Sequence, residues 1–148
     1  MELKVANIGM KFGMSHVEGA MSYGAPIAAI CDCNEENLRF AGERYSIPEE
    51  KRIADYNDLI NNEEINVVTV AVPDQQHKKI SCDFLRAGKN VLCEKPMAVN
   101  LREAEAMFEC ARANGVMLME AMWARLVPGT LKMLDIVSSG KLGDILGV

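Results

Sequence analysis

The sequence predicts an α/β protein built on a doubly wound parallel sheet. Short apolar segments of strand length alternate with amphipathic segments of helix length along the chain. Residues 66–72 are almost continuously apolar, as in a parallel strand covered on both faces. A turn containing two glycines joins the first apolar segment to the first helical one. These features favour an open sheet with helices on both sides.

The first strand is expected over residues 3–8, and a helix follows it to about Met21. Strand, glycine turn and helix together give the phosphate-binding geometry of a Rossmann unit. Glycines let the backbone approach a pyrophosphate, and the amino terminus of the helix offers unpaired N–H groups. The candidate cofactor-binding residues of this turn are Gly9, Met10, Lys11, Phe12 and Gly13.

Lys11 stands where the middle glycine of such a turn is expected. If its backbone needs a positive φ, the turn is strained and cofactor binding is weakened. If its φ is ordinary, the ammonium can approach the phosphates, and we expect this second arrangement. A solvated lysine with no effect on binding is the third alternative.

The second strand is expected over residues 27–31 and ends at Asp32, which follows Gly13 at about the 20-residue spacing of the dinucleotide fingerprint. An acid there accepts hydrogen bonds from the ribose hydroxyls and repels a 2′-phosphate. No basic residue follows Asp32 before Arg39, so we expect NAD rather than NADP. The alternative for Asp32 is a turn residue ahead of a helix capped by Asn34.

The other strands are expected near 52–54 and at 66–72, 91–93 and 116–119, and the start of one more is expected at 142–148. The other helices are expected at 57–61, before Gly88, from Asn100 to Asn114 and from Pro128, and a loop is expected at 123–125. In the helix from Asn100 to Asn114, the apolar residues of one face are Leu101, Ala104, Phe108 and Ala111. Asn100 and Glu103 have the spacing of a capping box. We find no internal repeat.

The strand at 91–93 runs directly into Glu94, Lys95 and Pro96. Pro96 disfavours helical geometry at Lys95, so the lysine should leave the strand extended. Open α/β sheets bind ligands at the carboxyl ends of their strands. A solvated Glu–Lys pair is the plain alternative. The glycine turn and Asp32 point to the same edge of the sheet, which favours a functional lysine.

The bulk properties exclude several classes of protein. The chain has 148 residues and a formal net charge of −5, which argues against nucleic-acid binding. No apolar run reaches membrane-spanning length, and no signal peptide precedes the first strand. The five cysteines match no zinc or redox motif, so we expect reduced thiols, no metal site and a cytoplasmic protein.

Four stretches resemble the Gfo/Idh/MocA oxidoreductases. They are Leu92–Ala98, Val70–Asp74 with His77, Gly9–His16 with Asp32, and Glu120–Arg125 followed by Pro128. The last is most similar to the dihydrodiol and xylose dehydrogenase branch. The resemblance implies an NAD(P)-binding Rossmann domain over residues 1–122. It also implies that residues 123–148 form a connecting loop, a helix and a first strand leading into a second, substrate-binding α/β domain that this chain lacks, together with its Asp and His.

The resemblance further implies an NAD(P)-dependent oxidoreductase that exchanges hydride between the nicotinamide and a hydroxyl or carbonyl of a sugar or polyol. Lys95 matches the active-site lysine, whose ammonium can stabilise alkoxide charge and relay a proton. The remaining candidate cofactor-binding residues are Ala71, Val72, Pro73, His77, Glu94, Lys95, Pro96, Trp123 and Arg125. Asp74 departs from the asparagine common there. We expect no activity from this chain alone, and a homo-oligomer at full length.

Two other functions stay open. One is a dinucleotide-binding or redox-sensing module without catalysis, and the other is a vestigial nucleotide site in a protein that works through protein contacts. A sensor has no need of a lysine at the nicotinamide end, so Lys95 favours the enzyme.

Overall fold

A six-stranded parallel sheet forms the centre of the molecule, as predicted. The computed structural model describes residues 2–147. The strand order is β3-β2-β1-β4-β5-β6. The strands are β1 (Val5–Ile8), β2 (Ile27–Cys31), β3 (Arg52–Ile53), β4 (Val67–Val70), β5 (Asn90–Cys93) and β6 (Leu118–Glu120). The order reverses between β1 and β4, which gives the sheet its two oppositely wound halves.

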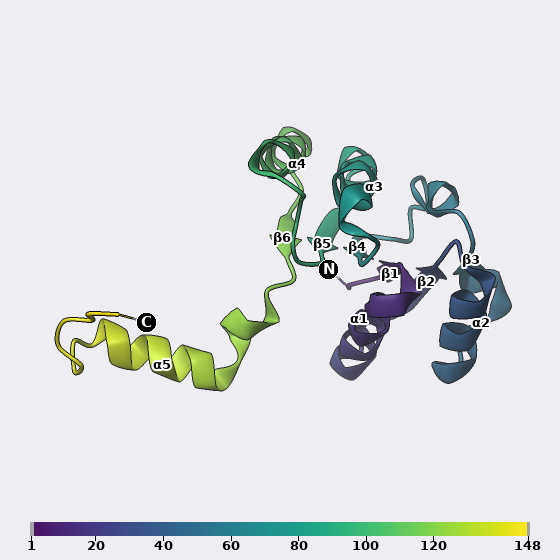
Figure 1. Cartoon of the computed structure of the whole chain (residues 1–148). Coiled ribbons are helices and arrows are strands. Elements are labelled where there is room, and N and C mark those ends of the chain that lie inside the picture. The colour runs from purple at the N-terminus through teal and green to yellow at the C-terminus, as the bar shows by residue number, and fades with distance from the viewer. Residues whose placement is uncertain (1, 148) are drawn as a thin grey trace.

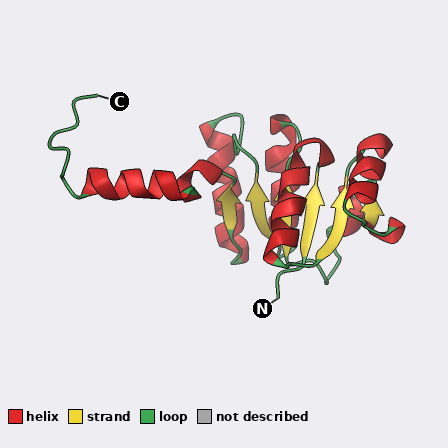
Figure 2. Ribbon diagram, turned by 90° about the horizontal axis from the view of Figure 1, so that it is seen from below, coloured by secondary structure: helices red, strands yellow, loops and turns green. Residues whose placement is uncertain are grey.

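Helices cover both faces of this sheet (Figure 1), with α1 and α2 on one side and α3 and α4 on the other. The α-helices are α1 (Met10–Tyr23), α2 (Glu35–Arg44), α3 (Asp74–Arg86), α4 (Leu101–Asn114) and α5 (Pro128–Ser138). The 3₁₀ helices are η1 (Glu49–Lys51), η2 (Tyr56–Leu59) and η3 (Trp123–Leu126). Figure 2 shows α5 extending away from the sheet, where it packs against η3.

Side chains cap the helices at the predicted positions. The Asn34 side chain accepts hydrogen bonds from the N–H groups of Glu36 and Asn37, at 2.9 and 3.1 Å. Asn100 accepts from the N–H of Glu103 at 3.0 Å. The Glu103 side chain does not accept a hydrogen bond from the Asn100 N–H, and its buried Oε2 has no partner among the described residues. The predicted capping box at α4 is therefore half formed.

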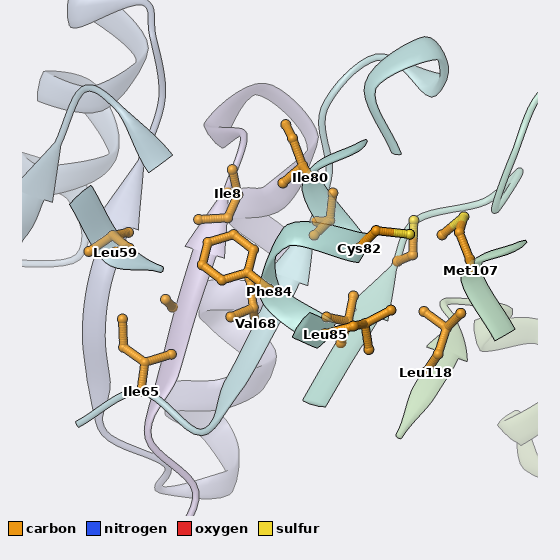
Figure 3. Close-up of a cluster of buried hydrophobic side chains, with 14 of the residues drawn as sticks. Ile8, Leu59, Ile65, Val68, Ile80, Cys82, Phe84, Leu85, Met107 and Leu118 are labelled. Atoms are coloured by element: carbon orange, nitrogen blue, oxygen red, sulfur yellow. The ribbon is translucent and has the colours of Figure 1, made fainter. Parts of the chain in front are cut away.

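Two apolar clusters hold the layers together. One lies between the sheet and α3 and α4 and includes Val68, Phe84 and Leu85, three of the side chains drawn in Figure 3. The other, on the α1 and α2 side, includes Met10 and Ile30. Each fully buried side chain of this size contributes about 1.5–3 kcal/mol relative to an exposed one. The clusters fix the strand ends that form the site.

The apolar face predicted for α4 is partly wrong. Met107 and Ala111 are buried, whereas Leu101 is 74% exposed and Phe108 is 44% exposed. β6 is the last strand of the sheet, so no further strand supports the outer half of α4. Leu101 and Phe108 instead line a groove of about 700 Å³ beside the loop 96–98.

Two predictions about the last part of the chain also need correction. Residues 123–125, expected in a loop, belong to η3. The strand expected over 142–148 does not form in residues 142–147, and Val148 lies outside the described residues. Figure 2 shows α5 leading this segment away from the sheet, so residues 142–147 do not lie beside any of its strands.

Burial should protect two of the thiols from alkylation. Burial, with a smaller contribution from the charge of Asp32, raises the pKa of Cys31 from 9.0 to about 12. Burial likewise raises the pKa of Cys93 to about 12. At pH 8 iodoacetamide should therefore label exposed Cys33 quickly and these two slowly, which mass spectrometry of the native and urea-unfolded protein would measure. Equal native rates at Cys31 and Cys33 would contradict the structure.

The same thiols make the fold sensitive to alkali. Unfolded thiols ionise near pH 9, whereas the buried thiols stay protonated to about pH 12. Between these values the unfolded state binds fewer protons than the folded state, so the free energy of unfolding should fall as pH rises. Urea unfolding at pH 8 and pH 10 would measure this loss.

Candidate cofactor and active site

The carboxyl ends of the strands meet along one edge of the sheet. Ile8 at the end of β1 lies opposite both Cys31 in β2 and Val70 in β4. Val70 lies in turn opposite Cys93 in β5. The residues that follow these strand ends are Gly9, Asp32, Ala71 and Glu94. Four of the predicted site residues therefore lie side by side, across the point where the strand order reverses.

Gly9 occupies a position that only glycine can fill. Its φ is +89°, in the region that side-chain-bearing residues rarely adopt. A Cβ there would lie 2.5 Å from the carbonyl oxygen of Ala71. The Gly9 N–H donates to the carbonyl of Cys31 at 2.8 Å. The chain therefore turns sharply from β1 into α1 while lying directly against the end of β4.

The helix α1 begins at Met10, so Lys11, Phe12 and Gly13 lie in its first turn. The turn between strand and helix is shorter than the sequence suggested, because Gly9 alone makes it. Gly13 donates to the carbonyl of Gly9 at 3.0 Å. A Cβ on Gly13 would lie 3.4 Å from the Cβ of Ala71, so this glycine permits close packing of α1 on β4.

Lys11 has an ordinary backbone conformation, as expected. Among the non-glycine residues described, positive φ occurs at Ser46 alone. The Lys11 side chain is exposed, with its Nζ 6.0 Å from the centre of the Phe12 ring. The backbone is therefore not strained by the missing glycine, and the N–H groups of Lys11 and Phe12 stay at the open first turn of α1.

Asp32 is held against the amino terminus of α1. Its Oδ2 accepts from the Met10 N–H at 2.7 Å. Its Oδ1 accepts from the Asn34 N–H at 2.8 Å, which is the turn contact of the alternative interpretation. Both contacts are present in one carboxylate. Asp32 therefore reaches the glycine turn from the end of β2 with a fixed orientation.

Glu94 and Lys95 extend the pairing of β4 with β5 into the site. The Glu94 N–H donates to the carbonyl of Val70 at 2.8 Å. The Lys95 N–H donates to Oε2 of Glu94 at 2.9 Å, and the Lys95 side chain is exposed at the edge of the sheet. The peptide bond between Lys95 and Pro96 is cis. The motif thus presents a lysine whose backbone is held by its neighbouring acid.

His77 is buried beneath this loop, with 1% of its surface exposed. Its Nδ1 lies 2.9 Å from the carbonyl oxygen of Pro96, and its Nε2 lies 2.8 Å from that of Val72. The ring therefore ties the end of β4 to the loop after Lys95. In this position it holds the loop and presents no free nitrogen to the open edge.

Two residues of the site, one acidic and one basic, were not predicted from the sequence to be functional. Glu120, at the end of β6, accepts from the Met97 N–H through Oε1 at 2.9 Å. His16 in α1 has its Nε2 3.1 Å from Oε1 of Glu94. The position of Glu120 at a strand end was an available signal. No spacing in the sequence indicated the pairing of His16 with an acid 78 residues away.

The two site residues predicted near the end of the chain, Trp123 and Arg125, differ in where they lie. Arg125 lines the groove together with Pro96, beside the lysine loop. Trp123 is exposed and does not line this groove. Val72 is half-buried and Pro73 is exposed at the start of α3. The structure therefore brings Arg125 close to the lysine motif and leaves Trp123 at the surface.

The residues at the strand edge fit a dinucleotide. Gly9 lets the chain turn directly against the end of β4, and the first turn of α1 that follows offers N–H groups and the positive end of the helix dipole. Asp32 supplies acceptors for hydroxyl groups. Within residues 2–147, no three His, Cys, Asp or Glu side chains gather as metal ligands. The described helices include none with the length and apolar character needed to cross a membrane.

Comparisons with known proteins agree with this geometry. A family model described as "Oxidoreductase family, NAD-binding Rossmann fold" matches residues 3–122. The trans-1,2-dihydrobenzene-1,2-diol dehydrogenase of Danio rerio is 38% identical over 103 residues, covering 70% of this chain and 30% of that protein. The inositol 2-dehydrogenase of Salmonella typhimurium is 30% identical over 147 residues, covering 97% of this chain and 43% of that protein.

A solved structure shows the same arrangement. An oxidoreductase from Agrobacterium radiobacter, in complex with NAD⁺, L-tartaric acid and magnesium, superposes with a TM-score of 0.88 at 27% identity. The match covers 97% of this chain and 42% of that one. The chain thus spans less than half the length of these relatives.

Proposed function

The chain belongs to the Gfo/Idh/MocA family of NAD-binding oxidoreductases, and we propose that it is the cofactor-binding part of a dehydrogenase that acts on a sugar or polyol. The observation that carries the proposal is Lys95 beside the point where the strand order reverses, two strands from Gly9. The relatives named for diol and inositol dehydrogenation support the substrate class.

The proposed division of the chain follows the fold. Residues 1–122 bind the cofactor, and residues 123–148 connect to a substrate-binding domain. The exposed α5, which packs against η3 and has no buried residue, supports this boundary. Turnover would then require the second domain, so this chain alone binds the cofactor without catalysis. A cytoplasmic location and a homo-oligomeric enzyme remain predictions.

The proposed cofactor contacts follow from the strand edge. The open N–H groups of Lys11 and Phe12 hold the pyrophosphate at the start of α1, which the Gly9 turn sets against the end of β4. Asp32 accepts from the ribose hydroxyls while keeping its bond to the Met10 N–H. In this proposal Val72 and Pro73 contact the cofactor beyond the end of β4, and Trp123 and Arg125 contact it at the nicotinamide end.

Lys95 performs the chemistry next to the cofactor in this proposal. Hydride exchange with the substrate carbon is the chemistry that a bound nicotinamide would supply. The Lys95 ammonium, exposed at the strand edge, would stabilise negative charge on the substrate oxygen and, when a carbonyl is reduced, donate a proton to that oxygen. Glu94, His77 and Glu120 hold the loop on either side of the lysine.

Titration of the chain with NADH and NADPH, followed by cofactor fluorescence, tests the proposal directly. We expect NADH to bind about tenfold or more tightly than NADPH, because Asp32 repels a 2′-phosphate. Asp32→Ala should weaken NADH binding and reduce the difference in affinity between NADH and NADPH. Glu63→Ala is the control, since Glu63 is an exposed acid just before β4, at the opposite edge of the sheet. Tighter binding of NADPH by the unaltered chain would contradict the assignment of Asp32.

A further inference from the structure

We infer that His16 is a positioning residue for Lys95, acting through the carboxylate of Glu94. The inference rests on the proposed function, since it assigns the residue that couples the cofactor-binding helix to the reactive lysine. His16 lies in α1, whose first turn faces the pyrophosphate in that proposal. Lys95 follows β5, two strands away from β1.

A single carboxylate makes the connection. Oε1 of Glu94 lies 3.1 Å from Nε2 of His16, and Oε2 accepts from the backbone N–H of Lys95 at 2.9 Å. The His16 and Glu94 side chains are only 12% and 23% exposed. Because the contact is partly shielded, water competes less for the Glu94 carboxylate than it would at an exposed contact. Both carboxylate oxygens are thus used.

No parallel connection replaces this one. Within residues 2–147, the His16–Glu94 contact is the one side-chain hydrogen bond between α1 and the loop 94–98. His77, Glu120 and the Cys93 thiol also contact that loop, but they hold Pro96 and Met97. The Glu94 N–H bonds the carbonyl of Val70, which holds the backbone of Glu94 and not that of Lys95. A shift of α1 when the cofactor binds therefore reaches the Lys95 backbone through Glu94.

The chemistry of the contact suggests matched variants. His16→Leu removes the ring nitrogen, whereas His16→Gln keeps a side-chain N–H group that can donate to Glu94. Glu18→Gln is the control, because Glu18 lies on the same helix and bonds Arg44 at 3.2 Å and Tyr45 at 2.7 Å, away from Lys95. All three proteins are compared with the unaltered chain after their unfolding temperatures are recorded.

The first measurement needs no cofactor. Nuclear magnetic resonance follows the chemical shift and the hydrogen exchange of the Lys95 amide. We expect exchange to be roughly tenfold faster in His16→Leu, as for the loss of about one hydrogen bond, and close to the unaltered rate in His16→Gln and Glu18→Gln. An unchanged exchange rate of the Lys95 amide in folded His16→Leu would overturn the inference. The inference would also be overturned if folded His16→Gln exchanged its Lys95 amide as fast as His16→Leu does.

The second measurement adds NADH. The unaltered chain should show a shift of the Lys95 amide on binding, and His16→Leu should bind about fivefold more weakly, a typical coupling between connected sites. Equal affinity in His16→Leu and the unaltered chain would overturn the coupling. If the unaltered chain does not bind NADH at all, the proposed function fails, and the cofactor-free measurement still decides whether His16 positions Lys95.

Discussion

Replacing Gly9 with alanine should lower the free energy of unfolding by about 3 kcal/mol or more and remove NADH binding. The added Cβ would lie 2.5 Å from the carbonyl oxygen of Ala71, a backbone atom that cannot move without distorting β4. The φ of +89° adds strain for any residue with a side chain. Urea unfolding and NADH titration would measure the two losses.

Gly19→Ala provides the matched control for this experiment. Gly19 lies inside α1, and a Cβ there would meet nothing within 4 Å. Alanine in a helix interior should stabilise the protein by roughly 0.5–1 kcal/mol relative to glycine. If both substitutions had the same effect, the close approach of Gly9 to β4 would not be the cause.

Lys95→Met should lower kcat by roughly 10²-fold or more in an enzyme that carries the second domain, because the substrate oxygen loses its charge stabiliser and proton relay. The methionine side chain has a similar length and no charge. Lys95 is exposed, so the free energy of unfolding should change little. Steady-state kinetics and urea unfolding of the same protein would separate these effects.

Lys78→Met is the control for the lost charge. Lys78 is an exposed lysine in α3, next to His77 in sequence. Its removal should leave kcat unchanged. A kcat in Lys95→Met near that of Lys78→Met would show that Lys95 has a structural role.

The order of the elements was predictable because local patterns determine it. Residues 67–70 are apolar except for Thr69, as is typical of a strand covered on both faces. The caps at Asn34 and Asn100 depend on groups two or three residues away, so sequence spacing reveals them. Asp32 was identified for the same reason, since its distance from Gly13 along the chain is set by the rest of α1, one turn and β2.

The remaining features depend on contacts between distant segments. The start of α1 at Met10 reflects the packing of Gly9 and Gly13 on Ala71, which directly follows β4. His77 contacts two carbonyls whose positions are set only after β4 and β5 pair. The burial of Met107 instead of Phe108 follows from the position of β6 at the edge. Residue type and periodicity contain no information about such neighbours.

The central place of β1 bears on how the chain folds during synthesis. β1 leaves the ribosome first, yet one of its two partners is β4, and the buried bond of 2.7 Å from Thr69 to Asn7 joins residues 62 positions apart. At about 5–20 residues per second, roughly 3–12 seconds separate the synthesis of these two residues. Throughout that interval one side of β1 has no strand to pair with. The nascent chain therefore exposes an unpaired strand edge until β4 emerges, and such an edge can pair with another chain.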